Sequence, residues 1–65
     1  MKLANATATC ATVATQLESE LRAAEKIADK ADPFLGWVLE ELRVEAFRLK
    51  NRLANLAEAV KRSGR

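Results

Sequence analysis

Eight apolar residues recur at alternating spacings of four and three along the second half of the chain, and this series constrains the fold most. They are Leu35, Leu39, Leu42, Ala46, Leu49, Leu53, Leu56 and Val60. At about 100° per residue they form one stripe along a helix, as in a coiled-coil seam. We therefore expect a long amphipathic helix over residues 33–62 that packs against a second helix.

A similar apolar series occupies the first half of the chain and predicts that second helix over residues 4–30. Its members are Leu3, Ala6, Cys10, Val13, Leu17, Leu21, Ala24, Ile27 or Ala28, and Ala31. Two starts compete, because Asn5 could cap an early helix and Thr15 with Glu18 forms a capping box. The later start would leave residues 1–14 disordered. The apolar series favours the early one.

The segment between the two series, residues 31–33, predicts a tight turn. Asp32 can cap the second helix, Pro33 suits its first position, and a residue before proline avoids the helical conformation. So short a turn folds two helices into an antiparallel hairpin. We predict an all-α fold in one domain, residues 1–65. The predicted hairpin seam comprises Leu17, Leu21, Ile27, Leu35, Leu39, Leu42, Leu49, Leu53, Leu56 and Val60.

The small size of the chain predicts self-association. A domain of 65 residues buries little surface and usually needs a disulfide, a metal or a second copy. Cys10 is the single cysteine and histidine is absent, so neither an internal disulfide nor a usual zinc site is available. We expect no metal or cofactor, Cys10 as a small core residue, and a homodimer that forms a four-helix bundle.

A second apolar group lies on the opposite side of the second helix, which one packing partner cannot cover. Trp37, Val44 and Phe47 form it, and an aromatic cluster with an arginine beside it is typical of a binding hot spot. The predicted partner-binding residues are Trp37, Glu40, Val44, Phe47, Arg48 and Asn51. Either a second copy or a different protein could occupy them. The sequence favours a small regulator that dimerises and inhibits a partner protein by occlusion.

Other functions have less support in the residues. Without histidine or a glycine-rich phosphate loop we expect no enzyme. Arg48, Arg52 and Arg62 could form a basic strip for RNA, although glutamates interrupt it. A structural subunit of a larger assembly is a third possibility. We expect a cytoplasmic location, because no apolar run is long enough for a bilayer and no signal peptide is recognisable.

The chain resembles two groups of small proteins: the first in size, helix layout and composition, and the second in length, two-helix layout, a short turn at Asp32 and a seam of leucine and alanine. One is the phage-encoded helical-hairpin regulators, whose likeness implies a dimer that binds and inhibits host proteins. The other is the Rop family of plasmid RNA-binding hairpins, whose likeness implies RNA as the partner. Both resemblances concern the architecture of the whole chain and assign no binding residue.

Overall fold

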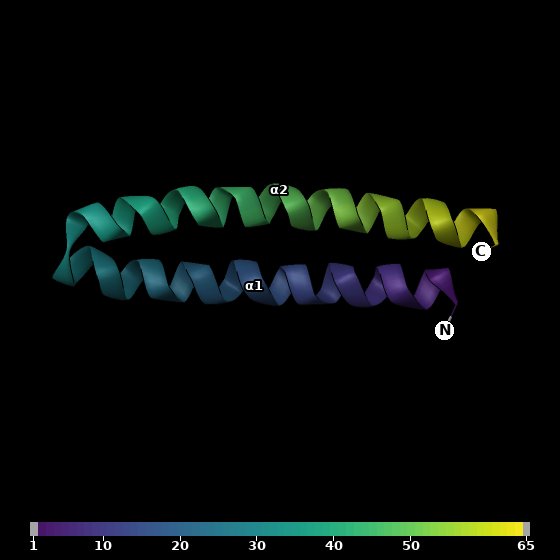
Figure 1. Cartoon of the computed structure of the whole chain (residues 1–65), viewed down its shortest axis with the longest axis horizontal. Coiled ribbons are helices and arrows are strands. Elements are labelled where there is room, and N and C mark those ends of the chain that lie inside the picture. Colours follow the sequence, from purple (N-terminus) through teal and green to yellow (C-terminus); the bar gives the residue numbers. More distant parts are fainter. Residues whose placement is uncertain (1, 65) are drawn as a thin grey trace.

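Two long antiparallel helices make up the chain, as the computed structural model in Figure 1 shows. Helix α1 spans Leu3–Ala31 and helix α2 spans Pro33–Ser63. The structure describes residues 2–64, so Met1 and Arg65, the ends of the expected domain, lie outside the described residues. The predicted all-α hairpin is confirmed. Within the described part, neither helix has the length and apolar character that crossing a membrane requires.

Helix α1 begins at the early one of the two predicted starts, and neither predicted cap is used. Lys2 precedes it in an extended conformation without a side-chain cap. The threonines that made this segment ambiguous are accommodated because their hydroxyls donate to carbonyls one turn back. Thr15, for example, donates to the carbonyl of Ala11 at 2.9 Å. Residues 3–14 are therefore helical, and the alternative of a disordered segment is wrong.

The turn follows the local chemistry of Asp32 and Pro33. Asp32 is extended, with φ −154° and ψ 103°, and its carboxylate accepts a hydrogen bond from the Phe34 N–H at 3.0 Å. Its own N–H donates to the carbonyl of Ala28 at 2.7 Å, which closes α1. One turn later, a Cβ at Gly36 would lie 3.3 Å from the Cα of Asp29. Glycine therefore allows the helices to approach closely beside the turn.

The two helices meet along a strip of buried and half-buried residues that we call the hairpin seam. On α1 it comprises Ala4, Thr7, Ala11, Ala14, Glu18, Leu21, Glu25 and Ala28. On α2 it comprises Gly36, Leu39, Arg43, Ala46, Lys50, Leu53, Ala57 and Val60. Both sets keep the three-four spacing of packed helices. Small residues dominate the α1 side of the hairpin seam. The contact between the helices is therefore not filled by the large apolar residues that were predicted to lie there.

The predicted seam is therefore wrong in part. Leu21, Leu39, Leu53 and Val60 do lie in the hairpin seam. Six predicted members are instead exposed: Leu17, Ile27, Leu35, Leu42, Leu49 and Leu56. Cys10 is exposed as well and is not a core residue. On α1 the buried strip is shifted by one residue from the predicted one. Ala14 and Glu18 occupy the contact where Val13 and Leu17 were expected, which corresponds to a rotation of the helix by about 100° about its axis.

The hairpin is a thin rod that leaves much of its surface open. Its extents are 48 × 16 × 11 Å, and its accessible surface is 5018 Å². A compact monomer of this mass, 7.2 kDa, exposes about 4,100 Å². The excess of about 900 Å² arises because two helices can bury only one side of each other.

Candidate interaction surfaces

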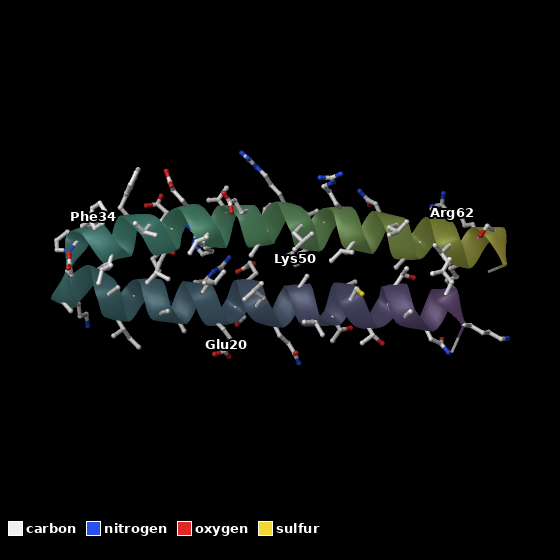
Figure 2. All side chains as sticks on the ribbon, viewed as in Figure 1. Glu20, Phe34, Lys50 and Arg62 are labelled. Carbon is white, nitrogen blue, oxygen red and sulfur yellow. The ribbon has the colours of Figure 1, made fainter. Side chains whose placement is uncertain are left out.

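Charged residues cross the hairpin seam in pairs. Arg43 Nε donates to Glu25 at 2.5 Å, and Lys50 Nζ donates to Glu18 at 3.4 Å. Glu18, only 7% exposed, also pairs with Arg22 at 3.2 Å. Figure 2 shows Lys50 between the helices, whereas Glu20 and Arg62 point outward. These pairs occupy seam positions where apolar residues are usual, and a different alignment of α1 and α2 would separate the charges from their partners.

The hydrogen bond to Glu25 raises the pKa of Arg43 above its ordinary value, although burial partly opposes this rise. The nearby negative charges of Glu25, Glu40 and Glu18 raise the pKa further. An arginine is already protonated at any ordinary pH. Its guanidinium therefore stays charged, and the pair with Glu25 has a structural role rather than an acid–base one.

An apolar groove runs along one side of the hairpin seam. It consists of two adjoining hollows that share Leu17 and Leu49. The hollow nearer the turn is lined by Leu17, Leu21, Leu42, Glu45, Ala46 and Leu49. The hollow nearer the chain ends is lined by Thr9, Cys10, Val13, Ala14, Leu17, Leu49 and Leu53. Most of the leucines expected between the helices thus line the open groove beside them.

The opposite side of the hairpin seam differs in character. Its hollow near the turn is lined by charged residues: Arg22, Glu25, Lys26, Asp29 and Arg43. Its hollow near the chain ends is lined mainly by alanines: Ala4, Asn5, Ala8, Ala11, Ala54, Ala57, Glu58 and Lys61. Beside the hairpin seam, leucines of both helices therefore line the groove side, whereas charged residues and alanines line the opposite side.

A second surface, the outer patch, lies on α2 away from the groove's floor. Its hollow is lined by Trp37, Glu40, Glu41, Val44, Glu45 and Arg48. Trp37 is 54% exposed, and its ring lies 6.2 Å from that of Phe34, between centroids, in a tilted arrangement. The patch thus combines an exposed aromatic pair with three carboxylates and one guanidinium, a composition suited to binding another protein.

The structure brings together four of the six predicted partner-binding residues. Trp37, Glu40, Val44 and Arg48 line the outer patch. Phe47 does not line it, because its ring lies beside Lys50, whose Nζ is 4.6 Å from the ring centroid. Asn51 is exposed and also does not line that hollow.

Sequence reasoning placed Glu41 at the border of this surface but missed Phe34 and Glu45 as parts of it. Phe34 could have been found, because it precedes Trp37 by three residues and such residues are adjacent on a helix.

The basic residues of α2 do not form an unbroken strip. Arg48 shares its hollow with three glutamates, and Arg62 lies 3.7 Å from Glu58. Among residues 2–64, no cluster of histidine, cysteine, aspartate and glutamate is arranged to hold a metal ion. The groove and the outer patch are therefore the two surfaces from which a function can be argued.

Comparison of the chain with models of protein families, with characterised proteins and with solved structures yields no match.

Proposed function

We propose that this chain is a small non-enzymatic regulator that pairs with a second copy through its apolar groove and binds a partner protein through the outer patch. The observation that carries the proposal is the presence on one hairpin of two apolar surfaces that adjoin only at Glu45, which lines both. A single contact cannot cover both, because the groove opens beside the hairpin seam and Trp37 lies on the outside of α2. Binding at the patch would inhibit the partner by occluding a surface it needs.

Self-association is supported by the amount of surface left open. The excess of about 900 Å² per chain corresponds to about 1,800 Å² for two copies, within the range of stable protein interfaces. Leu49 is 47% exposed although it lies in the middle of α2. Isolated leucines on a surface are ordinary, but a groove lined by leucines of both helices is typical of an interface.

The outer patch suits a partner that presents apolar and basic side chains together. Trp37, Phe34 and Val44 offer apolar contact area, and the carboxylates of Glu40 and Glu41 beside them favour lysine or arginine on the partner. A four-helix bundle made through the groove leaves the outside of each α2 accessible. One dimer would therefore present two copies of the patch.

Self-association is tested by the substitution Leu49→Arg, which places a charge in the middle of the groove. We expect sedimentation equilibrium to show a dimer for the unchanged chain and a helical monomer for this variant. Thr12→Arg is the matched control, because Thr12 is exposed and lines neither hollow of the groove. A monomeric unchanged chain at high concentration would refute this part of the proposal.

Partner binding is tested with the double substitution Trp37→Ala and Val44→Ala in affinity capture from cells of the source organism. We expect a specific protein to be lost, while circular dichroism and sedimentation show an unchanged fold and dimer. Phe47→Ala is the matched control, because Phe47 is an exposed aromatic of the same helix outside the patch. Retention of all captured proteins would contradict the assignment. Salt-sensitive RNA binding that requires Arg48 and Arg52 would instead favour the nucleic-acid alternative.

A further inference from the structure

The two ends of the rod carry opposite charge. The half that contains the turn, residues 17–47, has eight acidic and four basic side chains. The half that contains the chain ends, residues 2–16 and 48–64, has one acidic and six basic side chains. Two such rods that lie side by side attract when they point in opposite directions and repel when they point the same way.

Charged residues on the rims of the apolar groove give the same preference at specific positions. Along α1 the rim positions are Ala6, Val13, Glu20 and Ile27, and along α2 they are Val38, Glu45, Arg52 and Ala59. Each set repeats every seven residues and flanks the groove on its outer side. The only charged residues among these eight are therefore Glu20, Glu45 and Arg52.

The heights of these three residues along the rod determine which of them meet. At 1.5 Å per residue, Glu20 and Glu45 both lie roughly 5 Å from the middle of their helices, on the side of the turn. Arg52 lies about 6 Å from the middle of α2 on the other side. Two copies facing each other groove to groove can be related by either of two twofold axes, and these bring different rim residues together.

In the antiparallel arrangement each turn lies beside the chain ends of the other copy, and α2 packs on α2. Glu45 of one copy then faces Arg52 of the other, and symmetry makes this pair twice. In the parallel arrangement α1 packs on α2, and Glu20 of one copy faces Glu45 of the other, also twice. We propose that the groove is covered by a second copy of this chain in the antiparallel arrangement, held in that orientation by the two Glu45–Arg52 pairs.

The leucines of α2 fit this arrangement. With α2 packed antiparallel on α2, Leu49 lies close to Leu49 of the other copy, and Leu42 lies opposite Leu56. On α1, Leu17 meets its own equivalent and Cys10 lies opposite Ala24. Large residues therefore pair near the middle of the interface, and smaller ones pair towards the ends of α1, which suits close packing over the full length.

Charge reversal tests the antiparallel orientation of the two copies. This inference rests on the self-association proposed above. We expect Glu45→Arg alone and Arg52→Glu alone to weaken the dimer about 10- to 30-fold, because each turns two attractive contacts into two repulsive ones. The double swap should restore the affinity of the unchanged chain. A tighter dimer with Glu45→Arg would overturn the antiparallel arrangement while leaving self-association intact. A monomeric unchanged chain would overturn both.

Cross-linking through the native cysteine gives an independent readout. In the antiparallel dimer the two Cys10 residues lie about 21 Å apart along the rod, too far for a disulfide. We expect mild oxidation to cross-link the variant Ala24→Cys but neither the unchanged chain nor the control Ala23→Cys. Position 23 points away from the groove, one residue from the tested site. An efficient Cys10–Cys10 disulfide in the unchanged dimer would contradict the proposal.

Discussion

Substitution of Lys50 by methionine removes one charge from the hairpin seam while keeping most of the side-chain volume. Lys50 Nζ lies 3.4 Å from the carboxylate of Glu18, which is almost fully buried. At this distance the gross attraction is about 5 kcal/mol for an effective dielectric constant near 20 and about 1 kcal/mol in bulk water. The Lys50 side chain is one quarter exposed, so the pair lies between these limits.

Desolvation of both charges offsets much of that attraction, and Glu18 keeps its contact with Arg22 in the variant. The contact of Lys50 with the ring of Phe47 is also lost, at a cost of about 0.5 kcal/mol. We therefore expect Lys50→Met to lower the free energy of unfolding by about 1–2 kcal/mol. For a chain of this size, that corresponds to a decrease in Tm of roughly 5–15 °C.

Thermal and urea unfolding followed by circular dichroism measures this effect. All variants must be compared at one chain concentration, because self-association makes Tm depend on concentration. Lys26→Met is the matched control, since Lys26 is exposed on α1, and we expect a change within about 0.5 kcal/mol. Unchanged or increased stability of Lys50→Met would refute the reasoning. The double substitution Glu18→Leu with Lys50→Leu should instead equal or exceed the unchanged chain, because it removes the desolvation cost as well.

Three further substitutions probe the ends and the turn, each measured by the same unfolding experiments. Asp32→Ala removes the hydrogen bond to the Phe34 N–H and should cost about 1 kcal/mol; no change would mean that Pro33 alone starts α2. Gly36→Val should cost about 1–3 kcal/mol, because its side chain meets Asp29, and a stabilised variant would show that the helices separate easily there. Gly64→Ala should cost about 1 kcal/mol, since Gly64 ends α2 with φ 75°. An unchanged Tm would place the end of α2 outside the cooperative unfolding unit.

Elements that depend on neighbouring residues were predictable from the sequence. The turn at Asp32 and Pro33 uses a cap and a fixed proline φ, both of which act within a few residues. The helix bounds followed from the same signals and from the spacing of apolar residues. The start of α1 was harder to predict, because threonine hydroxyls compete for the backbone in a way that spacing does not reveal.

The candidate surfaces were only partly predictable. Trp37 and Val44 were placed on one face correctly because positions on a single helix follow from 100° per residue. Phe47 was assigned to the same face, but its ring lies beside Lys50, a residue of the hairpin seam. At 100° per residue Phe47 lies about 80° from Trp37 and about 60° from Lys50, so its surroundings depend on which strip of α2 the hairpin buries.

By itself the sequence determined two helices, their lengths, the turn between them and an excess of apolar surface, because each of these depends on local pattern and composition. Only the tertiary structure decided which strip of each helix is buried. The apolar stripe of α1 is wider than one helix–helix contact. Helix α1 could therefore have packed against α2 either through the strip of Ala14 and Glu18 or through the strip of Val13 and Leu17. Small residues that allow close approach, and charged residues that find partners across the contact, selected the first and left the leucines of the groove open.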